Sequence, residues 1–415
     1  MSQPMYEMEP LFELDLPEPK PKPVRKRRAK AATPAPAADR EVTFLHTADW
    51  QLGMTRRFLT GEAQHTYAAA RDAAVVRIGE IAAETGAEFV VVCGDVFDDP
   101  RVSTRVIRRT LDALGDYPVP VYLLPGNHDP LDATSVYTSA EFVAAKPDDV
   151  HVLDKPGVLR VRDGVSIVAA PWHTKHPSTD LVGDQLAALG PSDDIRIVVG
   201  HGGMDSLSPN PDPSIVVSAG VDAAVDALVD YVALGDRHST TSVGDTGRVW
   251  YSGAPEVTAF DNVETAPGNV LQVSLRRGGQ RSIDVQSHRV GQWAFRTLTQ
   301  DVNSAADVER LRATLSAIVD KPHTVVQLAL VGTLTVAENV LLEELLDEFG
   351  DRLAALTRWE REHDLTIVSG DIDLADLDLQ GYAADAAAEI VERSADDPDA
   401  RAALSLLLRL AGTVS

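Results

Sequence analysis

The sequence contains a single cysteine among its 415 residues, and it has no long apolar run. One cysteine excludes a disulfide within the chain, which fits a reducing compartment. No stretch approaches the ~18 consecutive apolar residues that a membrane span needs. The N-terminus lacks the basic-then-apolar pattern of a signal peptide. We therefore expect a cytoplasmic protein that has no membrane partner.

Positive charge is also scarce. The chain has 38 Lys and Arg against 63 Asp and Glu, which gives a formal net charge of -25. An acidic surface repels phosphate backbones. Action on nucleic acid would therefore need metal ions, a local basic patch or a partner protein. Residues 1–40 hold a basic run within a charged, Pro- and Ala-rich stretch, and this composition predicts a disordered tail.

The rest of the chain is organised around residues 89–99. Phe89 to Cys93 form a short apolar run that ends at Gly94, as in a strand buried on both faces. Asp95 follows at the carboxyl end of this strand, which is the edge where open α/β sheets bind ligands. Cys93 itself is predicted to be a core residue.

The pattern on both sides of this strand alternates between strands and helices. Strands at 41–48 and 119–124, with helices at 62–86 and 101–115, predict parallel strands joined by right-handed crossovers. Further strands are expected at 165–170, 195–199, 231–234, 248–252 and 269–275. We assign residues 41–290 to this first domain.

A second, smaller α/β domain is expected at 291–370, where the composition shifts. Its predicted elements are strands at 295–298, 324–330 and 365–368 and helices near 304–319 and 337–356. Residues 371–415 are predicted to form C-terminal helices. The second of these carries an apolar stripe that can pack on its own domain or dock a partner helix: Leu404, Leu406, Leu407, Leu408 and Leu410.

Five predicted strand ends carry polar residues, and glycine lies beside most of them. These residues are Asp49 and Gln51; Asp95 and Asp98; Asn127, His128 and Asp129; His201; and Asp236 and His238. Mixed Asp, Asn and His ligands suit Mn²⁺, Fe²⁺, Zn²⁺ or Mg²⁺. Two such ions about 3.5–4 Å apart can activate a water and stabilise both oxygens of a phosphoryl displacement.

The order Asp-x-Gln, Gly-Asp-x-x-Asp, Gly-Asn-His-Asp, Gly-His, Gly-Asp-x-His resembles the five motifs of the calcineurin-like metallophosphoesterases. The context Leu45-His-Thr-Ala-Asp-Trp-Gln-Leu-Gly53 is more similar to the nuclease subunits of bacterial SbcCD-type DNA repair exonucleases. The resemblance covers about residues 42–275. It implies an α/β fold, a two-layered β-sandwich flanked by helices, with a small α/β capping domain and C-terminal helices.

The resemblance also implies a role for each motif residue. One divalent ion would be held by Asp49, Gln51, Asp95 and His238. The other would be held by Asp95, Asn127, His201 and Asp236, so that Asp95 bridges the pair. His128 would be the general acid for the leaving oxygen, and Asp98 would hold its ring in place.

Two positions depart from the family pattern, which usually has histidine where this chain has Gln51 and Asp236. Both changes replace nitrogen by oxygen and favour harder ions. We therefore expect Mn²⁺ to be preferred over Zn²⁺. A degraded, inactive site is the alternative.

Basic residues near the predicted site are candidates for contacts with substrate phosphates. They are Arg237, inside the last motif, and Arg56 and Arg57 near the rim, with Arg101 and Arg105 on a neighbouring helix. His46, His65, His173 and Trp50 are expected to have structural or packing roles.

By resemblance, the function is hydrolysis of DNA phosphodiester bonds in repair and recombination. The chain would be an exonuclease, with endonuclease activity and homodimer formation left open. It would work with an SbcC-like ATPase subunit that binds the C-terminal helices. Three alternatives stay open: a phosphoesterase acting on small molecules such as cyclic nucleotides, a protein phosphatase, and a non-catalytic protein that binds DNA ends or the ATPase.

Overall fold

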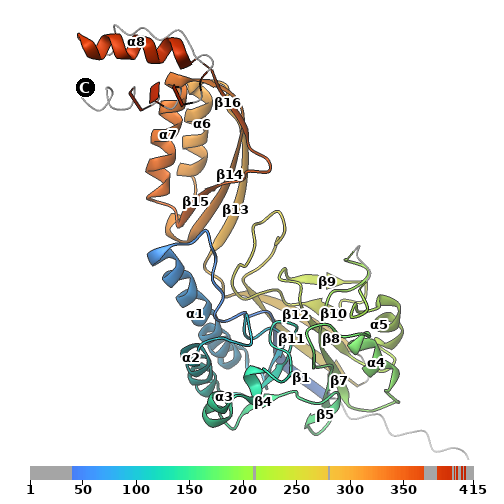
Figure 1. Ribbon diagram of the computed structural model, residues 1–415. Helices are drawn as coiled ribbons and strands as arrows, with labels where there is room; N and C mark the ends of the chain where they lie inside the picture. Colours follow the sequence, from blue (N-terminus) through green and yellow to red (C-terminus); the bar gives the residue numbers. More distant parts are fainter. Residues whose placement is uncertain are drawn as a thin grey trace, which may run out of the picture. The chain divides into compact units, whose positions relative to one another are not determined.

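The computed structural model describes residues 40–208, 212–278, 281–368 and 381–394, together with residues 397, 399–400, 403–404 and 406–407. Its strands form three sheets in this described part (Figure 1). Residues 1–39 of the predicted N-terminal tail lie outside the described residues, whereas Arg40 begins the first strand. Leu408 and Leu410 of the predicted apolar stripe also lie outside the described residues. No helix of the described part is long and apolar enough to cross a bilayer.

The first sheet has the order β12-β11-β1-β2-β3-β4. Its parallel strands are β1 (Arg40–Thr47), β2 (Val90–Cys93), β3 (Val121–Leu124) and β4 (Val150–Val152). The antiparallel strands β11 (Asn269–Arg277) and β12 (Ser282–Arg289) complete it. Because β1, β2 and β3 run in parallel, their carboxyl ends lie at one edge, as the sequence predicts.

The second sheet has the order β5-β6-β7-β8-β10-β9. It consists of β5 (Gly157–Arg162), β6 (Val165–Ala169), β7 (Ile195–His201), β8 (Tyr231–Gly235), β9 (Thr241–Val243) and β10 (Val249–Tyr251). One buried cluster joins the two sheets and includes Phe44, Val91, Ile197 and Tyr231. The two-layered sandwich predicted from the sequence is therefore confirmed.

Helices cover the outer faces of the sandwich. Neighbouring residues of β2 alternate between the sheets' shared core, which holds Val91, and an outer core, which holds Val90 and Val92. The outer core of the first sheet packs against α1 (Gly61–Thr85), α2 (Thr104–Gly115) and α3 (Ala140–Ala145). The outer core of the second sheet packs against α4 (Leu181–Ala187) and α5 (Ser218–Ala224). Burial on both faces explains why these strands are apolar throughout.

Helix boundaries follow local capping. The helix α1 ends where predicted, because Gly86 adopts the left-handed conformation with φ 64°. The helix α2 starts at Thr104, later than the predicted residue 101, because the Ser103 side chain caps it by accepting a hydrogen bond from the Val106 N–H.

A third sheet follows in the chain. It consists of β13 (Ala294–Asp301), β14 (Thr324–Thr335), β15 (Ala355–Arg358) and β16 (Asp364–Val368), with both β15 and β16 pairing with β14. The helices α6 (Ala305–Ser316) and α7 (Val336–Gly350) pack on it. The predicted helix 337–356 was wrong at its end, because α7 stops at Gly350 and residues 355–358 form β15.

The last described helix is α8 (Tyr382–Ser394), and two 3-10 turns lie at Val136–Thr138 and Lys321–His323. In the predicted apolar stripe, Leu404 is buried and Leu406 is exposed. The sequence reasoning missed the strands β4, β5, β9 and β12. All four are edge strands with at most one buried residue each, and β4 and β9 are only three residues long.

Candidate metal centre

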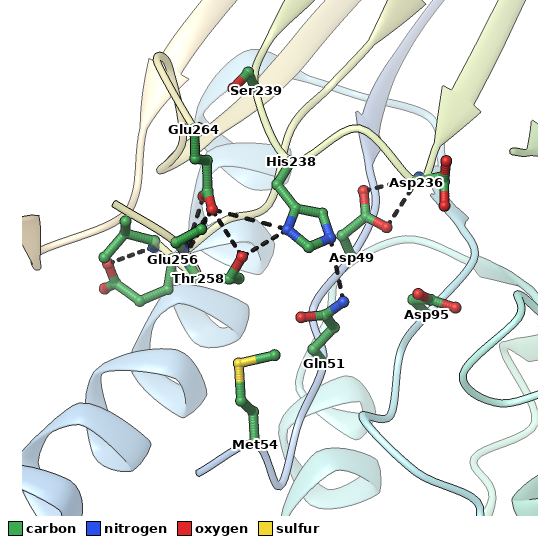
Figure 2. Close-up of polar contacts among 12 residues, drawn as sticks. Asp49, Gln51, Met54, Asp95, Asp236, His238, Ser239, Glu256, Thr258 and Glu264 are labelled. Carbon is green, nitrogen blue, oxygen red and sulfur yellow. Dashed lines mark hydrogen bonds and ion pairs between the residues drawn. The ribbon is translucent and has the colours of Figure 1, made fainter. Parts of the chain in front are cut away.

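The motif residues converge where the carboxyl ends of strands from both sheets meet. Asp49 and Gln51 follow β1, Asp95 follows β2, Asn127 follows β3, His201 ends β7, and Asp236 and His238 follow β8. Ligand atoms of Asp49, Asp95 and His201 all lie within 4.8 Å of one another. Figure 2 shows that Gln51, Asp236 and His238 lie around Asp49 in the same region.

Backbone strain is concentrated at this point of the fold. In the described chain, five non-glycine residues have positive φ, and four of them are predicted ligands: Asp49 (55°), Gln51 (44°), Asp95 (55°) and Asp236 (91°). Each such residue costs of order 1–3 kcal/mol and persists only where its surroundings enforce it. The turns therefore hold these side chains at a stability cost, as is common at functional sites.

Glycines let the strand ends approach one another. A Cβ at Gly126 would lie 2.2 Å from Asp95 Oδ1, and one at Gly94 would lie 2.1 Å from His201 Nδ1. A Cβ at Gly235 would lie 1.9 Å from the carbonyl oxygen of Cys93. These contacts are shorter than real Cβ atoms allow, so the glycines that the motifs contain are required by packing around the site.

His201 is fully buried, and its two ring nitrogens have different tasks. Nδ1 donates to the carbonyl oxygen of Cys93 at 2.8 Å, which leaves Nε2 facing the site, 2.7 Å from Asn127 Oδ1. Burial lowers the pKa of His201, but nearby Asp95, Asp49 and Asp236 outweigh it and raise this pKa to about 9. The carboxylates around Nε2 therefore favour a positive charge there.

Asp49 and Asp95 are buried carboxylates with few compensating charges. Both oxygens of Asp49 accept the N–H of Asp236, at 3.0 and 3.2 Å, and Asp95 Oδ1 accepts the N–H of His128 at 2.9 Å. Burial raises the pKa of Asp49 to about 7, against the opposing charges of His238 and His201. A buried carboxyl group that is this hard to ionise, as Asp49 is, fits a site that gains divalent cations.

Gln51 and His238 complete the donor set. Their Nε2 atoms lie 3.2 Å apart, and Gln51 Oε1 is buried without a hydrogen-bond partner. Rotating the amide by 180° exchanges its oxygen and nitrogen. The orphaned oxygen then faces the imidazole Nε2, and two lone pairs converge on one point. The residues at this end of the cluster therefore fit a divalent ion.

His128 lies at the edge of the centre. Its Nδ1 donates to the backbone carbonyl oxygen of Asp98 at 2.7 Å, while the Asp98 carboxylate stays 3.8 Å away. The orientation expected from the carboxylate thus comes from the peptide group of the same residue. Nε2 lies 4.0 Å from Asp95 Oδ2 and is the nitrogen available to a substrate. Burial raises the pKa of Asp98.

Several residues that support the site were not assigned roles from the sequence. Asp129, the last residue of Gly-Asn-His-Asp, is fully buried and accepts the N–H of Gly126 and of Phe97 and the hydroxyl of Tyr137. It ties the loops after β2 and β3 together, and its place in the motif was a usable signal. Thr258 and Glu264, which contact His238, have no motif that could reveal them.

The arginines that the sequence analysis proposed for phosphate contacts have different surroundings in the structure. Arg237 Nε donates to Thr241 Oγ1 at 2.9 Å, and Arg56 donates to the carbonyl oxygen of Thr258. Arg57 and Arg105 are exposed, and the exposed Arg101 pairs with Asp99. Of the residues that were expected to have structural or packing roles, Trp50 and His46 are buried. The His173 ring donates to the Asp154 carbonyl oxygen, and His65 is exposed.

A polar cavity of about 260 Å³ adjoins the centre and shares Asn127 and Asp236 with it. Lys175 and His176 also line this cavity, and neither was considered from the sequence. A group bound there would lie next to the ligand cluster, with two basic side chains beside it.

Similar proteins are found both by sequence and by structure. A subunit of the nuclease SbcCD from Rhodobacter capsulatus is 35% identical over 91 residues, a match that spans 21% of this chain and 21% of that relative. A solved dimetal phosphatase from Danio rerio aligns with 62% of this chain and 100% of its own, at 13% identity and TM-score 0.38. A second solved structure covers 60% and 99%, at 16% identity and TM-score 0.35.

The family model for calcineurin-like phosphoesterases matches residues 42–260, more than half of the chain. This range holds every residue of the cluster described above. The family implies two divalent metal ions, in agreement with the donor set. The chain belongs to the calcineurin-like phosphoesterase family.

Proposed function

We propose that this chain is a two-metal phosphodiesterase that cleaves DNA, the nuclease subunit of an SbcCD-like complex. The observation that carries the proposal is the meeting of seven donor side chains from five strand ends beside a free imidazole nitrogen of His128. The similarity to a subunit of the nuclease SbcCD supports the choice of DNA.

The residues divide the work as the motif order suggests. Asp49, Gln51, Asp95 and His238 would hold one ion, and Asp95, Asn127, His201 and Asp236 the other. When bound, the two ions supply an activated water and neutralise charge on the phosphate. His128 Nε2 donates a proton to the leaving oxygen, with its ring fixed by the Asp98 carbonyl. Arg237, Lys175 and His176 contact neighbouring phosphates.

Manganese is the proposed ion. Amide and carboxylate oxygens at Gln51 and Asp236 provide the harder ligands that favour Mn²⁺ or Mg²⁺ over Zn²⁺. The remaining imidazoles keep the site within the range of a first-row transition metal.

The negative net charge of the chain is the reason for proposing a partner protein that binds DNA. With a net charge of -25, the chain gains little attraction to DNA from its own surface. An SbcC-like ATPase that holds DNA in the cytoplasm would supply it. We propose the C-terminal helices from residue 371 as the docking element and residues 291–370 as the capping domain.

The test is Mn²⁺-dependent cleavage of end-labelled linear duplex DNA by the full chain, compared with His128→Gln. Removing a general acid costs roughly 100- to 10,000-fold in rate. Because the chain alone attracts DNA weakly, the assay is run at low salt with the duplex in excess. Under these conditions we expect the wild type to degrade the duplex and the variant to lose most of this activity. Hydrolysis of cyclic nucleotides with DNA left intact would identify a small-molecule phosphoesterase instead. Metal binding without any hydrolysis would identify a non-catalytic binding protein.

A further inference from the structure

His238 is held by side chains from a distant part of the chain. Its Nδ1 lies 2.6 Å from Thr258 Oγ1, and the Thr258 hydroxyl lies 2.7 Å from Glu264 Oε2 (Figure 2). Thr258 and Glu264 belong to the loop between β10 and β11, outside all five motifs. Both are almost completely buried, so water does not compete for these contacts.

The direction of the hydrogen bonds follows from the donors available. Glu264 is a carboxylate and only accepts. It takes the N–H of Thr258 at 3.1 Å, the N–H of Ala259 at 2.6 Å and the Thr258 hydroxyl proton. The single hydroxyl proton is thereby used, so Thr258 Oγ1 must accept from His238 Nδ1–H. This arrangement assigns the proton to Nδ1 and leaves the Nε2 lone pair facing Gln51 and the centre.

The same loop is fastened to the third sheet. The Asp261 N–H donates to the Phe295 carbonyl oxygen at 3.0 Å, and Asp261 Oδ1 accepts the N–H and the hydroxyl of Thr297 at 2.8 and 2.5 Å. The Phe260 ring lies 5.7 Å from that of Phe295. Both partner residues belong to β13.

A second attachment lies just before β13. The Glu256 carboxylate is fully buried and accepts the N–H of Gln292 at 2.8 Å and of Trp293 at 3.0 Å. Residues 256–264 therefore contact the site on one side, through Thr258 and Glu264, and the start of the third sheet on the other. Asp261 is three residues from Thr258 and three residues from Glu264 along the chain. A displacement of β13 that moves Asp261 can therefore reach both residues through a short segment of backbone.

We propose that Thr258 and Glu264 are positioning residues that fix the tautomer of His238 for metal binding, and that residues 256–264 couple its orientation to β13. The proposal rests on the proposed role of His238 as a metal ligand. Its readouts are metal affinity and ring protonation, so it can fail while phosphodiesterase activity is present, and the reverse also holds.

The first experiment compares Thr258→Val with Thr258→Ser in the full chain. Valine keeps the shape and removes the hydroxyl, whereas serine keeps the hydroxyl. Mn²⁺ titration calorimetry should show one of two sites weakened about 10- to 100-fold in Thr258→Val, as for other residues that orient metal ligands. Thr258→Ser should stay near wild type. The unaffected site reports correct folding, and Thr110→Val, a buried threonine of α2, is the matched control.

Nitrogen NMR of the Zn²⁺-loaded protein gives the second readout. In the wild type and Thr258→Ser, we expect one His238 ring nitrogen to be protonated as Nδ1–H and the other to be metal-bound. In Thr258→Val the Nδ1–H signal should shift and exchange faster with water. Equal affinities and equal His238 signals in Thr258→Val and wild type would overturn the assignment of Thr258 and Glu264.

The coupling is tested with Asp261→Ala, against Asp163→Ala in an exposed turn as the control. Loss of the Asp261 contact should speed hydrogen exchange at the Thr297 amide. It should also weaken the same Mn²⁺ site at least threefold and shift the His238 signals. Faster exchange at Thr297 with unchanged Mn²⁺ affinity would overturn the coupling to β13.

Discussion

His201 Nε2 lies 2.7 Å from Asn127 Oδ1, while its Nδ1 donates to the carbonyl oxygen of Cys93. Two carboxylate oxygens also face Nε2, Asp95 Oδ1 at 3.5 Å and Asp236 Oδ1 at 3.9 Å. The negative charges of these carboxylates favour a cation at this point. The carboxylates around this imidazole nitrogen are the clearest physical sign that the site is built for positive charge.

Divalent metal should therefore stabilise the fold. At a free Mn²⁺ concentration 100 times the dissociation constant, one site contributes about 2.7 kcal/mol. We expect the Tm to rise by several degrees with Mn²⁺ and to fall again with a chelator. In Asp95→Asn the rise should be absent, whereas Asp163→Asn on an exposed turn should behave as wild type. Scanning calorimetry measures the Tm of each variant with and without Mn²⁺. A wild-type Tm that does not change with Mn²⁺ would contradict the prediction.

Gly126 should tolerate no side chain. In Gly126→Ala the new Cβ meets Asp95 Oδ1 and the Asp95 backbone nitrogen, at 2.2 and 2.6 Å. We expect a loss of about 1–3 kcal/mol in unfolding free energy, together with loss of metal binding. Gly190→Ala is the control, because its Cβ meets nothing within 4 Å. Urea unfolding and Mn²⁺ titration of both variants measure the effect. If Gly126→Ala and Gly190→Ala have the same stability and the same Mn²⁺ affinity, the turn at Gly126 can shift to accept a Cβ without cost.

Gln51→His should change metal selectivity. A third imidazole in the cluster offers nitrogen where the chain now offers an amide oxygen, and nitrogen ligands suit Zn²⁺ better than Mn²⁺. We expect the Zn²⁺ to Mn²⁺ affinity ratio to rise roughly 10-fold. Competition titrations give the ratio, with Gln286→His on the edge strand β12 as the control. An unchanged ratio would mean that residue 51 does not reach the ion.

Acid should destabilise the fold through His46. Its Nδ1 lies 3.0 Å from the Tyr231 hydroxyl and its Nε2 lies 3.2 Å from the Leu234 carbonyl oxygen. Burial lowers the pKa of His46 to about 3, from 6.5. The unfolded chain therefore binds this proton first, so the stability present above pH 6.5 is lost as the pH falls toward 3.

The loss amounts to on the order of 5 kcal/mol over that whole interval. Urea unfolding of the metal-free protein at pH 7.5 and pH 5 should show a smaller pH dependence in His46→Gln than in the wild type. His65→Gln, which changes an exposed histidine, should keep the wild-type dependence. If His46→Gln and the wild type lose the same stability, His46 does not contribute to acid unfolding.

Much of this structure is predictable from local patterns. The glycine after Cys93 and the carboxylate at Asp95 mark a strand end, and repetition of this pattern along the sequence locates the cluster. Parallel topology then places these ends together. Thr258 and Glu264 could not be found in this way, because their role depends on a loop whose approach to His238 is a tertiary contact.

Short edge strands escaped prediction for a related reason. Strands such as β5 have few buried residues, so alternation of apolar and polar side chains is weak there. Residues 355–358 continued the apolar pattern of α7 but pair with β14. Pairing with a neighbouring strand overrides helix propensity where the chain turns after Gly350.

The most direct test of the central claim is Mn²⁺-dependent hydrolysis of bis-p-nitrophenyl phosphate by the full chain, with Asp95→Asn and Asp163→Asn alongside. This diester needs no partner and no DNA-binding surface, so it isolates the chemistry of the cluster. We predict turnover by the wild type and by Asp163→Asn that stops when Mn²⁺ is chelated, and loss of turnover in Asp95→Asn. Hydrolysis that survives in Asp95→Asn, or a wild type that binds two Mn²⁺ ions and cleaves nothing, would contradict the account.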